Sequence, residues 1–141
     1  NLIHRSHLCI FLYGGLILQV YLLYFDTEIM KIQAEVLQLN TTGDNLEKEI
    51  TTVLQSTGYD FYDYSDEITI LVDDQGFFKP NNPVFEIVSE FGDRTQLAGR
   101  LLFVRNIENE FSVDIGSIKY EDIFNLRTNL QIQLIGVTKG E

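Results

Sequence analysis

An uncharged apolar block opens the hydropathy pattern of this chain. Residues 8–25 read LCIFLYGGLILQVYLLYF and contain no charged side chain. At about 1.5 Å per residue, a helix of this length approaches the ~30 Å thickness of a hydrocarbon core. Backbone amides inside lipid must be satisfied within the segment itself, which a helix achieves. The block therefore predicts a single membrane-spanning helix.

The side chains expected to anchor this helix are its large apolar residues and its paired glycines: Leu8, Phe11, Leu12, Gly14, Gly15, Leu18, Leu22 and Phe25. A helix buried in a protein core is also apolar on every side, and a removed signal peptide is a third interpretation. Arg5 precedes the block and acidic residues follow it. Because positive residues stay on the cytoplasmic side, we expect the N-terminus inside and the rest of the chain outside, in a periplasm, a lumen or at the cell surface.

A stripe of apolar residues follows from residue 26. Its members recur every three or four residues, which places them on one face of a helix: Ile29, Ile32, Val36, Leu39, Leu46, Ile50 and Val53. Residues 40–43 interrupt the stripe, and Asp44 with Glu47 predicts the N-terminal cap of a second helix that ends near Ser56. The stripe packs either on the sheet of its own domain or on the same stripe of a neighbouring subunit.

From residue 58 the pattern changes to a two-residue period. Phe111, Val113 and Ile115 alternate with polar residues, as do residues 130–134. This period is typical of strands with one buried face, and short spacings favour antiparallel hairpins. Further strands are expected at 68–72, 84–91 and 97–105, a link at 59–67, a hairpin loop at 106–110 and a short helical turn at 120–124. The predicted fold class is α+β: a long N-terminal helix, a short second helix and an antiparallel sheet or small sandwich of five to six strands.

These patterns divide the chain into a membrane segment (1–25), a helical stalk (26–57) and an acidic β-rich domain (58–141). The net charge is −11, and all 21 acidic residues lie after residue 25. This balance argues against nucleic acid and anionic lipid headgroups as partners of the outer part. The expected partners are membrane lipid, other membrane helices and copies of the same chain.

Candidate chemistry is sparse. Both histidines, His4 and His7, precede the apolar block, so the predicted membrane separates them from every outer carboxylate. We therefore expect no Ser–His–Asp or Cys–His arrangement in the outer part. We predict that the chain is not an enzyme and that it carries no cofactor. One cluster of carboxylates offers oxygen ligands for calcium: Asp60, Asp63, Asp66 and Glu67. Their spacing differs from that of an EF-hand loop, and a solvated acidic loop is the alternative interpretation.

The layout of the whole chain resembles type IV pilins and pseudopilins. The shared features are an apolar N-terminal helix, its continuation as a soluble stripe, a Gly-bearing break and an acidic antiparallel sheet. Position 5 is Arg5 where that family has Glu, so no functional residue is carried over. The resemblance implies a single-pass structural subunit of a membrane complex or filament. The alternative function is a membrane-tethered binding module, with or without calcium, that presents its β-domain to a partner.

Overall fold

The computed structural model describes residues 17–40, 45–108 and 113–140. In chain order the elements are β1 (Ile17–Asp26), β2 (Lys31–Asn40), α2 (Asn45–Leu54), β3 (Tyr59–Asp63), β4 (Ile68–Asp73), the 3-10 helix η1 (Gly76–Phe78), β5 (Pro83–Val88), β6 (Arg94–Ala98), β7 (Leu101–Glu108), β8 (Val113–Gly116), α3 (Tyr120–Asn129) and β9 (Gln131–Val137). The larger sheet is antiparallel in the order β2-β1-β7-β4-β3, with β8 also paired to β7, and the smaller sheet has the order β6-β5-β9.

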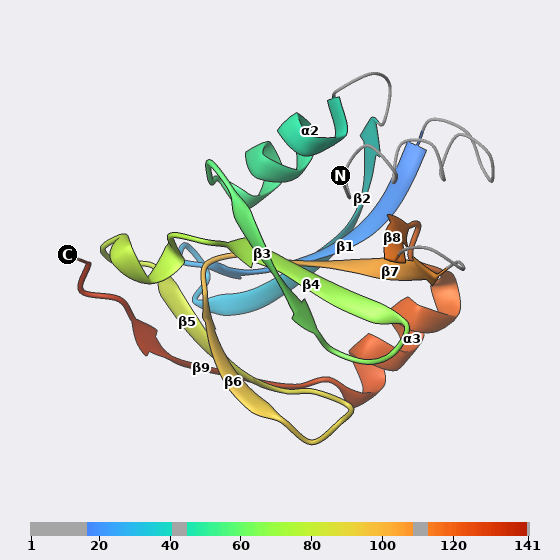
Figure 1. Cartoon of the computed structure of the whole chain (residues 1–141). Helices are drawn as coiled ribbons and strands as arrows, with labels where there is room; N and C mark the ends of the chain where they lie inside the picture. The colour runs from blue at the N-terminus through green and yellow to red at the C-terminus, as the bar shows by residue number, and fades with distance from the viewer. Residues whose placement is uncertain (1–16, 41–44, 109–112, 141) are drawn as a thin grey trace.

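Three layers result from this order (Figure 1). Helix α2 covers one face of the larger sheet, while the smaller sheet and α3 cover the other face. One apolar cluster lies between α2 and the larger sheet, where Leu46 and Ile50 of α2 are fully buried. The second cluster lies on the opposite face and includes Phe85 of the smaller sheet and Leu126 of α3. The larger sheet is therefore the middle layer, with an apolar cluster on each side.

Strand β7 shows what this arrangement requires of a sequence. Its residues 101–104 are Leu-Leu-Phe-Val, and all four side chains are fully buried. Leu101 and Phe103 belong to the cluster on the α3 side, whereas Leu102 and Val104 belong to the cluster under α2. A strand with both faces covered has no solvent side, so it reads as an unbroken apolar run rather than an alternation.

The same reasoning explains why the predicted membrane helix is wrong. Residues 17–26 form β1, whose Leu18 and Leu22 face α2 while Tyr21 and Leu23 face the other apolar cluster. A strand that is buried on both faces is as apolar as a membrane helix. Length did not distinguish a strand from a helix here, because residues 8–16 are also uncharged and extend the apolar run. Within the described residues, no helix has the length and apolar character that a membrane crossing requires. The predicted single-span localisation and the α+β class with its long helix are corrected accordingly.

The predicted anchor residues divide into two groups. Leu18 and Leu22 are core residues at 0% and 2% exposure, and Phe25 packs half-buried against the α3-side cluster. The remaining anchor residues lie outside the described part: Leu8, Phe11, Leu12, Gly14 and Gly15.

The predicted helical stalk is also wrong in its first half, which forms strand β2. Residues 27–30 make the turn between β1 and β2, where Met30 has a φ of 54° and the Glu28 amide donates to Asp26 Oδ1 at 2.9 Å. Ile32 and Val36 lie on one face of β2. Residues four apart share a face of a strand as well as a face of a helix, so the spacing did not decide between them.

The other predicted elements agree in part with the structure. The second helix is confirmed as α2, with Leu46 and Ile50 buried and Val53 half-buried, and strands are found at 68–72 and 131–134 as predicted. The single strand predicted at 97–105 is wrong because Gly99, with a φ of 104°, turns the chain between β6 and β7. Strand β3 occupies most of the predicted link, and α3 is longer than the predicted turn.

Candidate functional site

A groove runs beside α3, between this helix and two loops of the sheets. One hollow of about 360 Å³ lies between the first turns of α3 and the β3–β4 loop, residues 64–67. A second hollow of about 450 Å³ lies between the end of α3 and the turn after β5. Tyr64 and Glu90 line both hollows, so we treat them together as the α3 groove.

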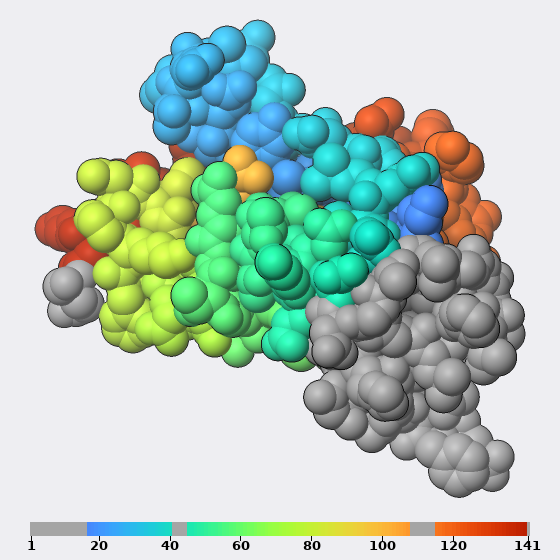
Figure 2. Space-filling view, turned by 90° about the horizontal axis from the view of Figure 1, so that it is seen from above, coloured from blue at the N-terminus to red at the C-terminus, as the bar shows by residue number. Residues whose placement is uncertain are grey.

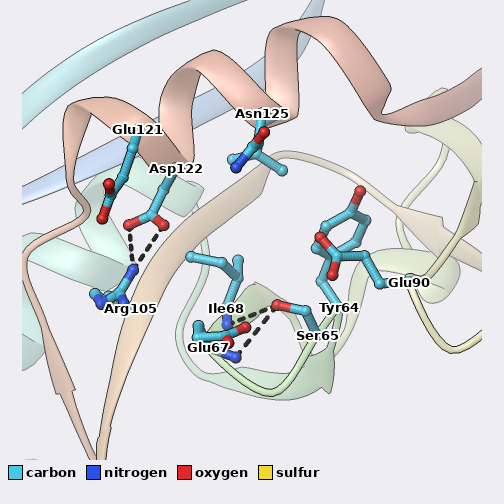
Figure 3. A pocket seen from close by; sticks show the side chains of 10 residues that line it. Tyr64, Ser65, Glu67, Ile68, Glu90, Arg105, Glu121, Asp122 and Asn125 are labelled. Atoms are coloured by element: carbon cyan, nitrogen blue, oxygen red, sulfur yellow. Dashed lines mark hydrogen bonds and ion pairs between the residues drawn. The ribbon is translucent and has the colours of Figure 1, made fainter.

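The N-terminal end of α3 is fixed to the larger sheet by an ion pair. Arg105 of β7 places Nη1 at 2.6 and 2.7 Å from the two carboxylate oxygens of Asp122 (Figure 3). Asp122 Oδ2 also accepts the backbone N–H of Lys119 at 2.9 Å, at the start of the helix. Both side chains of the pair are mostly covered, at 21% and 10% exposure. The helix that forms one wall of the groove is thus held by a charge-assisted contact.

Two serines fix the opposite wall. Ser65 Oγ accepts the backbone N–H groups of Ile68 and Glu67, at 3.0 and 3.3 Å. Ser89 Oγ accepts the N–H groups of Phe91 and Asp93, both at 3.2 Å. The two loops are joined because the Glu90 N–H donates to the Tyr64 carbonyl at 2.8 Å. These bonds hold the second wall of the groove in one conformation.

Three further carboxylates line the groove, from Glu67, Glu90 and Glu121. All three residues are exposed, and none has an ion pair with a basic side chain in the described part of the chain. Figure 3 shows Glu121 on the α3 side, with Glu67 and Glu90 on the opposite side. Since the Arg105 charge is already matched by Asp122, the groove has an excess of negative charge.

Tyr64 lies between the two hollows and is 4% exposed. Its ring packs edge-on against Phe103 of the core, with centroids 6.2 Å apart, and its hydroxyl points towards α3 (Figure 3). No described residue is hydrogen-bonded to this hydroxyl. Burial, and secondarily the charge of Glu90, raises the pKa of Tyr64, so the hydroxyl stays protonated at neutral pH and can donate to a ligand.

The same geometry gives little support for nucleophilic catalysis. Both serine hydroxyls of the groove are occupied by backbone N–H groups, and neither contacts a basic side chain. Histidine, the usual partner of a serine nucleophile, is absent from the described residues, because His4 and His7 both lie outside them. The groove offers negative charge, hydrogen-bond acceptors and the hydroxyl donor of Tyr64.

The acidic residues considered for calcium are spread over two elements. Asp60 and Asp63 lie on the edge strand β3, while Asp66 and Glu67 lie in the loop that follows it. No three acidic, histidine or cysteine side chains among the described residues are grouped closely enough to hold a metal ion. Only Glu67 of this set lines the α3 groove.

Sequence reasoning did not identify most of the groove. Two signals could have indicated the ion pair. Arg105 ends an apolar run, and Asp122 lies three residues after Lys119, a spacing at which acidic residues cap helices. Tyr64 and Glu90 are far apart in the sequence and carry no local signal. The chain matches no protein-family model, no curated protein and no solved structure. The resemblance to pilins therefore stays a prediction.

Proposed function

We propose that this chain is a non-enzymatic binding module whose α3 groove receives a basic segment of a partner protein. The observation that carries this proposal is a set of three carboxylates, Glu67, Glu90 and Glu121, around the buried Tyr64. None of the three has an ionic partner in the part of the chain that the structure describes. A lysine or arginine side chain supplies the positive charge and the N–H donors that such a set accepts.

The length of the groove suits a short peptide segment. Glu121, Asn125 and Asn129 are spaced four residues apart along α3 and line the two hollows. At 1.5 Å per residue, these three positions span about 12 Å. An extended peptide advances ~3.3 Å per residue, so the groove holds about three or four residues. The amide groups of Asn125 and Asn129 can accept from and donate to the peptide backbone.

The energy available favours weak and salt-dependent binding. Two unit charges 4 Å apart attract by about 1 kcal/mol in bulk water and about 4 kcal/mol at an effective dielectric constant of 20. The three glutamates are exposed, so the lower end of that range applies, and salt screens them over roughly 8 Å at physiological ionic strength. The net charge of −11 speeds the encounter with a basic partner. Three such pairs contribute about 3 kcal/mol, so we expect a dissociation constant in the millimolar range at low salt.

A fluorescence-anisotropy titration tests this function. The probe is a labelled hexapeptide of alternating lysine and glycine, and a hexapeptide of alternating glutamate and glycine serves as the reference. We expect binding of the lysine peptide alone, weakened about tenfold in E90Q/E121Q, which removes two carboxylates of the groove. The matched control is E28Q/E47Q, which makes the same charge change at exposed positions on the β1–β2 turn and on α2.

Three results would overturn the proposal: no binding of the lysine peptide at low salt, equal weakening by both double variants, or binding of the glutamate peptide. A free polyamine such as spermine is the remaining competitor for the same chemistry. If spermine displaces the labelled peptide at a far lower concentration than unlabelled peptide does, the groove binds a small amine rather than a protein segment.

A further inference from the structure

Strand β2 is the edge of the larger sheet and the longest edge strand among the described residues. Its ten residues pair with β1 on one side, and no described strand pairs with its other side. The end of the β1–β2 hairpin stands out from the rest of the molecule, as the blue part of Figure 2 shows. An exposed edge of this length is a template for pairing with another strand.

Two other edge strands, β3 and β9, carry features that discourage such pairing. Strand β3 has five residues, two of which are the exposed acids Asp60 and Asp63. Strand β9 pairs with β5 through an irregular register at Val84 and Phe85. Strand β2 is less protected, because its two charged residues, Lys31 and Glu35, have opposite signs and are spread over ten positions.

The side chains of β2 match a second copy of the same strand. Ile32, Ala34 and Val36 follow one another on a single face, with Ile32 and Val36 37% and 38% exposed. A strand that pairs with its own copy about a two-fold axis must be complementary to its own reversed sequence. With the axis at Ala34, Ile32 lies opposite Val36 of the second copy, and Val36 lies opposite Ile32.

We propose that two copies of this chain associate through β2, antiparallel and centred on Ala34, so that the two six-stranded sheets become one continuous sheet. This register pairs residues 31–37 and places Lys31 diagonally from Glu35 of the second copy, within the reach of cross-strand side chains.

Neighbouring registers are less favourable. An axis at Glu35 would place two glutamates directly opposite each other, which is destabilising. An axis at Gln33 leaves five pairs within the strand, and an axis at Val36 sets Ile32 opposite Asn40. This inference uses the edge of β2 and does not depend on the α3 groove.

Sedimentation velocity of the full chain at rising concentration tests the association. We expect a monomer–dimer equilibrium for the unmodified chain. Val36→Lys places a charge opposite Ile32 and raises the dissociation constant of the dimer at least tenfold. The matched control is Ile135→Lys on edge strand β9, where the side chain is 42% exposed, and it leaves the equilibrium unchanged. Because each copy carries a charge of −11, added salt strengthens the dimer.

Cysteine cross-linking in a Cys9→Ser background tests the register. Directly opposite residues have Cβ atoms about 4.5–5.5 Å apart, close to disulfide geometry, so Ala34→Cys forms a covalent dimer on mild oxidation. Val36→Cys does not cross-link with itself, because the two positions lie about 13 Å apart along the strands in this register. A mixture of the Ile32→Cys and Val36→Cys chains does cross-link.

The proposal is overturned by a chain that stays monomeric up to about 1 mM at high salt, or by a dimer indifferent to Val36→Lys. Efficient self-cross-linking of Val36→Cys without that of Ala34→Cys would overturn the register centred on Ala34.

Discussion

Replacing Asp122 by alanine tests how α3 is held over the sheet. The change removes both contacts of 2.6 and 2.7 Å with Arg105 and the 2.9 Å contact with the Lys119 amide. Arg105, whose side chain is only 21% exposed, is then left without its ionic partner. Hydrogen bonds to charged groups contribute ~1.5–3 kcal/mol, a lost helix cap ~1 kcal/mol, and breaking a fully buried pair ~3–5 kcal/mol. Since this pair is only partly exposed, we expect a loss of about 2–4 kcal/mol in the free energy of unfolding.

Urea denaturation followed by circular dichroism measures this loss. With a slope of about 2 kcal/mol per molar urea, the midpoint falls by roughly 1–2 M. The matched control is Glu86→Ala, which breaks the Arg94–Glu86 pair at 2.7 Å on the surface, where Arg94 is 66% exposed. That control costs less than about 1 kcal/mol, because water and side-chain entropy offset most of a surface pair. A loss below about 0.5 kcal/mol for Asp122→Ala, or equal losses for both variants, would refute the reasoning.

Three further outcomes follow from the packing. Leu22→Ala removes a fully packed β1 side chain from the cluster under α2 and should cost about 2–5 kcal/mol in a urea melt; a cost under 1 kcal/mol would contradict a buried β1. Gly76→Ala would place its Cβ 2.3 Å from the Ala98 carbonyl oxygen, so we expect a lower melting temperature and a loss of about 1–3 kcal/mol. Burial, with a smaller contribution from Glu47, raises the pKa of Tyr59, whose buried hydroxyl has no hydrogen-bond partner among the described residues. The stability linked to this hydroxyl is complete below the unfolded pKa of about 10 and is lost as the pH rises above that value. Tyr59→Phe should therefore reduce the loss of stability at alkaline pH without weakening the protein at pH 7. An unchanged alkaline loss in this variant would contradict the prediction.

Local patterns were sufficient for α2 and β9, although a similar spacing predicted a helix where β2 forms a strand. Residues 46 and 50 share the buried face of α2, and the alternation at 131–134 marks β9, so periodicity alone predicted both. The prediction failed for β1, although the shorter apolar run of β4 was recognised as a strand. Strand β1 has both faces covered, and its unbroken apolar run matched a membrane helix better than an alternating strand.

The candidate site was hidden for a different reason. Its walls come from a loop near residue 65, a turn near residue 90 and a helix near residue 122, which only the tertiary fold brings together. The carboxylates of the groove are ordinary surface residues when the sequence is considered alone. Among the acids considered for calcium, only Glu67 lines the α3 groove, while Asp60 and Asp63 lie on β3.

The most direct test of the central claim is a titration of the isotope-labelled protein with the lysine–glycine hexapeptide, followed by two-dimensional NMR of backbone amides. Binding in the α3 groove predicts chemical-shift changes concentrated at residues 64–68, 88–92 and 121–129, and their loss at high salt. Shift changes spread evenly over the acidic surface, or concentrated on β3 around Asp60 and Asp63, would contradict the claim.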